Sequence, residues 1–163
     1  MSGMLGAVLA LLAAGCGGSS KPSTSSGAPA TTSATTGATG TTIAVKSSKL
    51  GKILVDDQGR TLYLFEKDKG PKSTCSGACA VAWPPVTTTG TPSAGSGATA
   101  ALLSTTARDD GTMQVDYNGH PLYRYVGDSK AGDTNGQGLK QFGAEWYVLS
   151  PTGAKIEEKH DSS

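Results

Sequence analysis

Cys75 and Cys79 lie four positions apart, a spacing that places both thiols on one side of a helical turn. Outside the cytoplasm, an even pair of cysteines favours a disulfide. A redox-active pair and a metal site are the alternatives. The spacing differs from the Cys-x-x-Cys of thioredoxin-like proteins, and a metal would need further ligands, for which there are only His120, His160 and Met113. A disulfide that closes so small a ring would stabilise one loop rather than the whole fold.

A second candidate group combines tyrosines with carboxylates. A Tyr, an aromatic residue two positions later and an Asp three positions after that occur twice in the chain. These groups could form a binding or electron-transfer surface. The interpretation that we favour places the aromatic rings in the core, with each Asp accepting backbone N–H hydrogen bonds at the start of the next loop. The residues are Tyr63, Phe65 and Asp68 in the first copy, and Tyr123, Tyr125 and Asp128 in the second.

The loop after the second copy lacks cysteines and is rich in oxygen ligands. It contains Asp128, Asp133 and Asn135, followed by Gly136 and Gln137. An Asp-Thr-Asn-Gly run resembles part of a calcium loop, but the alternating ligand set and the closing Glu are missing. Turn chemistry is therefore the interpretation that we favour for this loop.

The repeated motif belongs to a longer internal duplication. Residues 54–68 and 114–128 share Val, Asp, Gly, Leu, Tyr and Asp at matching positions. A period this short indicates two copies of one supersecondary unit. Trp83 and Trp146 follow the two motif tyrosines by 20 and 23 residues. We expect these two tryptophans to fill the core between each hairpin and its loop.

Each copy begins with a predicted β-hairpin. The first joins 52–55 to 61–65 through an Asp-rich turn that ends in Gly, and the second joins 112–116 to 121–125 through Asn-Gly. The period of two places Tyr63 and Phe65 on one face of their strand, with Leu62 and Leu64 on the other. In the second copy Tyr123 and Tyr125 share a face in the same way.

The fold class that follows is mainly β. We predict two tandem hairpin-based repeats packed into one small antiparallel β domain, because a single hairpin is only marginally stable alone. A short helical turn is expected near 76–82, and 87–101 is expected to be a loop between the repeats. Further strands are expected at 42–45, 102–106 and 146–149.

The start of the chain predicts export. An apolar run ends at Gly15 and is followed by Cys16, and its dozen residues are too few to span a bilayer as a helix. Residues 1–15 therefore read as a signal peptide, and the small residues before Cys16 are typical of a lipobox. The alternative is an ordinary signal peptide that happens to contain a Cys, and residues 1–3 lack the usual basic charge.

The rest of the chain divides by composition. Residues 16–42 comprise the lipidated Cys and a Ser/Thr/Gly/Pro tether that cannot bury enough apolar surface to fold. Residues 43–158 form the repeat domain, with repeat one at about 50–86 and repeat two at about 110–152, and 159–163 are a tail. The net charge of +1 provides no field that would attract nucleic acid.

These motifs together resemble a known family. The runs Gly-Arg-Thr-Leu-Tyr-x-Phe-x-x-Asp, Cys-Ser-Gly-x-Cys-Ala-x-x-Trp-Pro-Pro and Trp-Tyr-Val-Leu, spread over about 50–152, are similar to the predicted bacterial lipoproteins with a Tyr-x-aromatic-x-x-Asp motif. That family is also described as a secreted repeat of unknown function. The resemblance implies an extracytoplasmic protein built from tandem copies, and it implies no activity or catalytic residue.

Two classes of function remain open. The favoured one is a non-enzymatic binding or structural module of the cell envelope, anchored to the membrane through lipidated Cys16, with an envelope protein or cell-wall polymer as partner and no cofactor. The alternative is an extracytoplasmic redox or metal-handling protein that uses Cys75 and Cys79. No Ser-His-Asp set or paired glutamates indicate catalysis. We expect a site where the two long loops differ rather than where the hairpins agree.

Overall fold

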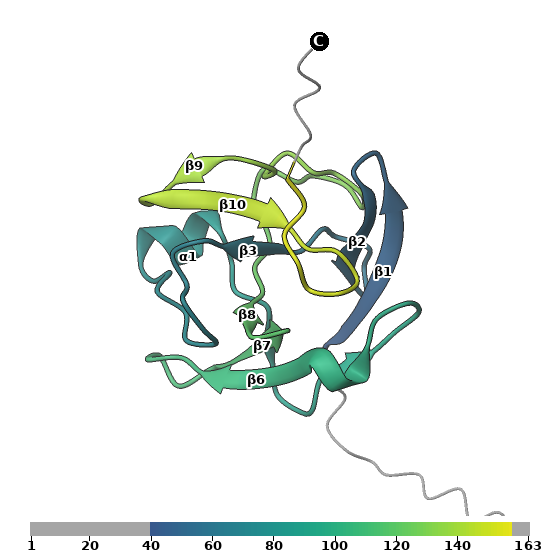
Figure 1. The fold of residues 1–163 in the computed structure, drawn as a ribbon. Helices are drawn as coiled ribbons and strands as arrows, with labels where there is room; N and C mark the ends of the chain where they lie inside the picture. The colour runs from purple at the N-terminus through teal and green to yellow at the C-terminus, as the bar shows by residue number, and fades with distance from the viewer. Residues whose placement is uncertain (1–39, 158–163) are drawn as a thin grey trace, which may run out of the picture. The chain divides into compact units, whose positions relative to one another are not determined.

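The computed structural model describes residues 40–157, and the predicted signal peptide, Cys16 and most of the tether lie outside them. Within 40–157 the chain forms ten short strands, one α-helix and one 3-10 helix (Figure 1). The helices are α1 (Ala78–Ala82) and the 3-10 turn Ala100–Leu102. The strands are β1 (Thr42–Ser48), β2 (Gly51–Asp56), β3 (Tyr63–Phe65), β4 (Thr87–Thr88), β5 (Ser93–Ala94), β6 (Leu103–Ala107), β7 (Met113–Tyr117), β8 (His120–Pro121), β9 (Lys140–Gln141) and β10 (Ala144–Val148).

The strands pair into three small sheets. Their orders are β2-β1-β5, β3-β10-β9 and β4-β7-β6, and β8 pairs with β7. Every pairing is antiparallel except that of β1 with β5. In Figure 1 the β9–β10 pair lies on one side of β3 and the β6–β7 pair on the other. The predicted fold class, mainly antiparallel β with a short helical turn, is confirmed.

The two predicted hairpins are present but short. In the first, the Asp56 N–H donates to the Arg60 carbonyl at 2.9 Å, and Val55 then pairs with Thr61. Beyond that bridge the arms separate, because β2 pairs with β1 and β3 pairs with β10. In the second, β7 pairs with β8 at two positions and with β6 at five. Longer partners elsewhere in the chain therefore outcompete hairpin pairing.

The segment between the copies is more ordered than the loop expected at 87–101. Residues 87–88 form β4, which pairs with β7. Residues 93–94 form β5, which pairs with β1. The segment between the copies is therefore paired with one strand of each copy. Thr and Ser backbones can join such ladders without any apolar pattern, so no feature of the sequence predicted these two strands.

The core consists of two apolar clusters separated by β3. Tyr63 and Phe65 point into one cluster, and Leu62 and Leu64 point into the other, as the period of two predicted. Both faces of this strand are buried. The first cluster holds the aromatic motif residues of both copies, together with Trp83, Trp146 and the two cysteines.

Candidate functional site

The two copies meet at their motif tyrosines. The Tyr63 N–H donates to the Tyr123 carbonyl at 2.9 Å, and the Tyr123 N–H donates to the Tyr63 carbonyl at 3.0 Å. This pair of hydrogen bonds forms an antiparallel bridge between equivalent residues. It therefore relates the two copies locally by a two-fold axis.

Each tyrosine hydroxyl donates to the motif Asp of the opposite copy rather than to the Asp of its own copy. The Tyr63 hydroxyl donates to Asp128 Oδ2 at 2.7 Å, and the Tyr123 hydroxyl donates to Asp68 Oδ2 at 2.6 Å. Both tyrosines are fully buried. Burial, and then the neighbouring carboxylate, raises the pKa of both phenols far above the usual value, so both remain protonated donors. Burial also raises the pKa of Asp128, although hydrogen bonds from Tyr63 and Asn135 oppose this shift.

Each carboxylate also fixes the loop that follows it. Asp68 Oδ1 accepts the Thr74 N–H at 2.7 Å and the Thr74 hydroxyl at 2.6 Å. Asp128 Oδ1 accepts the Asn135 N–H at 2.9 Å. This is the loop-anchoring role expected for an Asp at these positions. One oxygen of each Asp therefore orders its own copy, and the other oxygen binds the opposite copy.

The remaining aromatic rings form a single stack that alternates between the copies. The ring of Phe65 stacks on Trp146 with centroids 4.0 Å apart, Trp146 on Trp83 at 3.9 Å, and Trp83 on Tyr125 at 4.3 Å. The planes of the two tryptophans differ by only 4°. Each ring thus contacts rings of the opposite copy, which binds the two halves of the domain together.

The motif tyrosines meet this stack edge-on. Tyr63 contacts Trp83 with centroids 5.3 Å apart, and Tyr123 contacts Trp146 at 5.1 Å. A Cβ at Gly136 would lie 2.8 Å from the Trp83 ring and 2.9 Å from the Tyr63 ring, so only Gly fits there. The motif residues are thus core and interface rather than the lining of a cleft.

The Asp/Gly-rich loop of the second copy shows turn chemistry. Asp133 Oδ2 accepts the N–H groups of Ser129 and Lys130 at 3.0 and 2.9 Å. Among residues 40–157 no group of three or more His, Cys, Asp or Glu side chains is placed to hold a metal ion. The carboxylates of this loop instead satisfy backbone donors of the same loop.

Cys75 and Cys79 form a disulfide, with Cα atoms 5.3 Å apart, at the start of α1. The two residues are only 1% and 6% exposed and pack in the same cluster as Trp83. Their sulfurs therefore offer little access to an attacking thiolate. Burial of this kind fits a structural staple better than an exchanging redox pair.

A cavity of about 350 Å³ lies beside the disulfide loop. One wall is the segment 72–77, which includes Cys75 of a disulfide that the second copy lacks, and the other is the β6–β7 turn at 107–110. Ala80 of α1 completes the lining. The cavity therefore lies beside the loop that carries the disulfide of the first copy.

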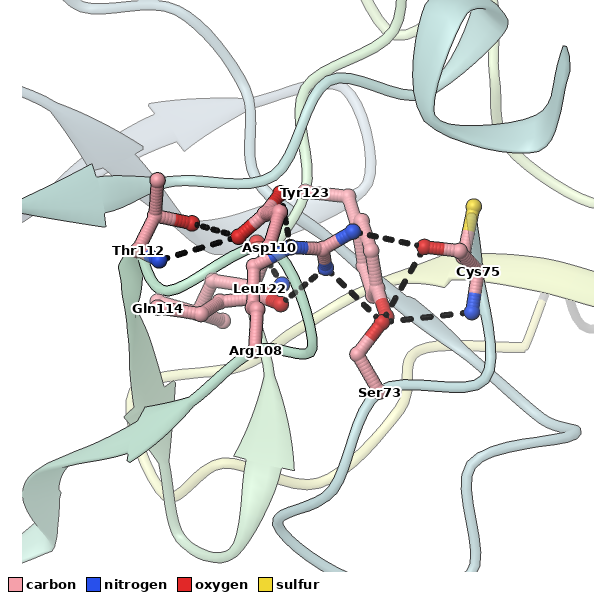
Figure 2. A network of polar contacts seen from close by, with 8 residues as sticks. All are labelled: Ser73, Cys75, Arg108, Asp110, Thr112, Gln114, Leu122 and Tyr123. Atoms are coloured by element: carbon pink, nitrogen blue, oxygen red, sulfur yellow. Dashed lines mark hydrogen bonds and ion pairs between the residues drawn. The ribbon is translucent and has the colours of Figure 1, made fainter. Parts of the chain in front are cut away.

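Arg108 holds the two walls of this cavity together (Figure 2). Its side chain is only 7% exposed. One guanidinium nitrogen donates to Ser73 Oγ at 2.9 Å and to Gln114 Oε1 at 2.6 Å, and the other donates to the Cys75 carbonyl at 2.8 Å. Asp110 lies 3.5 Å from Nε. Charged donors to a loop carbonyl and hydroxyl make strong, specific contacts.

Ser73 connects the cavity wall to the buried motif. Its Oγ lies 2.6 Å from the Tyr123 hydroxyl, which in turn donates to Asp68. In the other copy the Tyr63 oxygen instead accepts the N–H of Gly136 at 3.3 Å. Ser73 therefore links the Tyr123–Asp68 pair to this cavity.

Sequence reasoning did not single out Arg108. A lone Arg in an Ala-Arg-Asp-Asp-Gly turn is typical of a solvated residue, and its burial depends on a loop more than thirty positions earlier. The sequence contains no signal that identifies this contact. The expectation that a site would lie where the two loops differ stays a prediction, and this cavity is lined by one of those loops.

The duplication places two equivalent aspartates in opposite environments. Burial alone would raise the pKa of Asp56, but Arg124 and Arg60 donate to it at 2.8 and 2.9 Å and lower the pKa below its usual value. Among residues 40–157 Asp116 has no such cation, and burial raises its pKa to about 6. Its Oδ2 accepts the Thr106 hydroxyl at 2.5 Å, and within the described part of the chain its Oδ1 has no partner.

The fold and the shared motif define a class of duplicated β domain, in which two copies of one unit are joined by exchanged side chains. The chain belongs to the family described as a secreted repeat of unknown function, whose model matches residues 44–87 and 104–150. Each match begins one strand earlier than the predicted repeats, so each unit includes β1 or β6. Neither a curated protein nor a solved structure shows significant similarity to this chain.

Between residues 40 and 157 no helix is long and apolar enough to cross a membrane. The family description indicates secretion, and hence a location outside the cytoplasm. That compartment is oxidising, which agrees with the disulfide between Cys75 and Cys79.

Proposed function

We propose that this protein is a non-enzymatic binding module of the bacterial cell envelope, held at the membrane by a lipid on Cys16. The tether at 17–42 would separate the folded domain from the membrane surface. Membership of a secreted repeat family supports the extracytoplasmic location. Lipid attachment rests on the lipobox-like sequence that ends at Cys16.

The cavity between the disulfide loop and the β6–β7 turn is the ligand site in this proposal. The observation that carries it is the buried Arg108, which belongs to one wall of the cavity and donates hydrogen bonds to Ser73 and Cys75 of the other. The Cys75–Cys79 disulfide fixes the same loop covalently. A site that is ordered before the ligand arrives loses less conformational entropy on binding.

The chemistry of the lining favours an uncharged polar ligand. Lys72 and Arg108 are balanced by Asp109 and Asp110, and Lys72 pairs with Asp109 at 3.2 Å. The rest of the lining combines hydroxyl and small apolar groups from Ser73, Thr74, Ser76, Gly77, Ala80 and Ala107. Sugar hydroxyls and peptide amides of a wall polymer match such a surface, whereas a strongly anionic ligand does not.

Co-sedimentation of the purified full chain with insoluble cell-wall polymer tests this proposal. Ala80→Trp would fill the cavity and should weaken binding by at least about tenfold, equivalent to about 1.4 kcal/mol. Val81→Trp is the matched control, because Val81 is the next residue of α1, is 74% exposed and lies outside the cavity. Equal binding by the two variants, or no binding by the unsubstituted chain, would overturn the proposal.

A further inference from the structure

Two buried tyrosines donate their hydroxyl hydrogen bonds to carboxylates, although an acceptor with a lower desolvation cost could accept them. Tyr117 is also fully buried, and its hydroxyl donates to the backbone carbonyl of Pro151 at 2.8 Å. Tyr63 and Tyr123 instead donate to Asp128 and Asp68. A carboxylate, buried at Asp68 and partly buried at Asp128, carries a larger desolvation cost than a carbonyl oxygen, so packing alone gives no reason for this choice.

The same two tyrosines touch a continuous array of easily oxidised rings. Tyr63 meets Trp83 edge-on, Tyr123 meets Trp146 edge-on, and the two indoles are stacked at 3.9 Å. Indole and phenol are the aromatic side chains that lose an electron most readily. Rings in van der Waals contact exchange an electron easily, and stacking spreads the positive charge over both indoles.

From this geometry we propose that the ring array reduces one-electron oxidants that act outside the cytoplasm. The oxidising equivalent is then held on Tyr63 or Tyr123. This activity is separate from ligand binding in the cavity. Tyr125 is the partly exposed end of the stack, whereas Phe65 at the other end is buried and hard to oxidise. Oxidation therefore enters at Tyr125 and moves inward to Trp83.

The chemistry balances without a bound cofactor. The external oxidant takes one electron from the stack, which leaves an indole radical cation on Trp83 or Trp146. Tyr63 then passes one electron to the indole, and its hydroxyl proton moves to Asp128 Oδ2 across the 2.7 Å hydrogen bond. The products are a neutral tyrosyl radical, a protonated carboxyl group and a restored indole. Tyr123 and Asp68 carry out the same step in the other copy.

The carboxylate is essential to this step because an oxidised phenol is a strong acid. A positioned base that receives the proton typically accelerates such a transfer by about 100-fold or more. Each acceptor is also held in place by its loop, Asp68 by Thr74 and Asp128 by Asn135. The geometry therefore holds the base in position before the oxidant arrives.

Flash oxidation of the full chain in detergent tests the proposal, with a photogenerated ruthenium(III) polypyridyl complex as the oxidant. The chain should carry Tyr147→Phe, because Tyr147 is a further partly exposed tyrosine with a carboxylate partner, Glu145. Transient absorption and electron paramagnetic resonance distinguish tyrosyl from tryptophanyl radicals. We expect a tyrosyl radical whose oxygen accepts an exchangeable hydrogen bond.

Three variants in this background then locate the radical. Tyr63→Phe with Tyr123→Phe should abolish the hydrogen-bonded tyrosyl signal and leave the oxidising equivalent on the indoles or Tyr125. Asp68→Asn with Asp128→Asn should slow formation of the tyrosyl radical by roughly 100-fold. Tyr117→Phe is the matched control, since it removes a buried hydroxyl with a backbone acceptor and should change nothing.

The proposal fails if the hydrogen-bonded tyrosyl signal survives Tyr63→Phe with Tyr123→Phe, or if Tyr117→Phe removes it. Circular dichroism establishes whether each variant is folded. Should the double variants not fold, the Tyr147→Phe chain with Tyr117→Phe added still decides the matter, because Tyr117 also accepts a hydrogen bond, from the Thr99 N–H at 2.9 Å. In that chain, a radical without an exchangeable hydrogen bond to its oxygen would overturn the proposal.

Discussion

The Tyr63 hydroxyl of the first copy donates to the Asp128 carboxylate of the second at 2.7 Å. Asp68, which belongs to the same motif as Tyr63, instead accepts the hydrogen bond from Tyr123. The motif is therefore completed only when both copies fold against each other. Tyr63 and Tyr123 both lie within the core cluster that the two copies share, Asp68 is buried, and Asp128 is partly buried. A repeat of this type is half of a folding unit.

Removing one hydroxyl should destabilise the fold measurably. We expect Tyr123→Phe to lower the free energy of unfolding by about 1–3 kcal/mol, because it leaves Asp68 buried without this donor. Tyr63→Phe should act in the same direction, and Tyr63→Phe with Asp128→Asn should cost less than the sum of the single changes. Urea denaturation provides the measurement. Tyr147→Phe is the surface control, and a loss for Tyr123→Phe no larger than for Tyr147→Phe would contradict the prediction.

The two copies should fold only together. If the chain is divided between residues 90 and 91, each piece loses the tryptophan and carboxylate partners that the other supplies. We therefore expect each piece alone to be unfolded and an equimolar mixture to regain the folded state. Stacked Trp83 and Trp146 should give an exciton-coupled pair of circular dichroism bands in the mixture and in the intact chain. A stable fold in either piece alone would contradict this prediction.

The faces of the strands could be predicted because they depend only on local backbone geometry. The period of two placed Tyr63 and Phe65 in one cluster and Leu62 and Leu64 in the other, and the structure agrees. The pairing of the strands could not be predicted equally well. Both arms of the first hairpin and the first arm of the second find longer partners elsewhere, and that competition is decided by the whole fold.

The sequence does not indicate that each motif Tyr pairs with the Asp of the opposite copy. Asp68 and Asp128 are equivalent in the duplication, so nothing in it favours one of them over the other as the partner of Tyr63. Arg108 was missed for a related reason, since its burial arises from contact with the distant loop at 73–75. The duplication does indicate where the copies differ, and the cavity lies there.

The disulfide should contribute modestly to stability and resist reduction. A ring of five residues gains about 2 kcal/mol in the loop-entropy account, so Cys75→Ala with Cys79→Ala should cost about that much. Because both sulfurs are buried, thiol labelling in the presence of reductant should be slow under native conditions and fast in denaturant. Rapid labelling of the native chain would instead favour the redox interpretation of this pair.

The equivalent aspartates, Asp116 and Asp56, should give opposite pH dependences of stability. The pKa of Asp116 in the folded chain is about 6, raised from 3.8 first by burial. The folded state therefore binds the proton more tightly than the unfolded chain does, and stability falls as pH rises from about 4 to about 6. The pKa of Asp56 is lowered by Arg124 and Arg60, so its contribution is present near neutral pH and is lost in acid.

Asp116→Asn and Asp56→Asn separate these two contributions. Above pH 6 Asp116→Asn removes a buried charge with no cation near it, so we expect that variant to be more stable than the original chain by up to about 3 kcal/mol. The gain should vanish near pH 4, where Asp116 is already protonated. Asp56→Asn should instead destabilise the chain at neutral pH, because Arg124 and Arg60 lose their shared acceptor. Thermal unfolding between pH 4 and pH 8 provides the measurement, and a loss of stability for Asp116→Asn at pH 8 would show that the carboxylate is ionised and stabilised there.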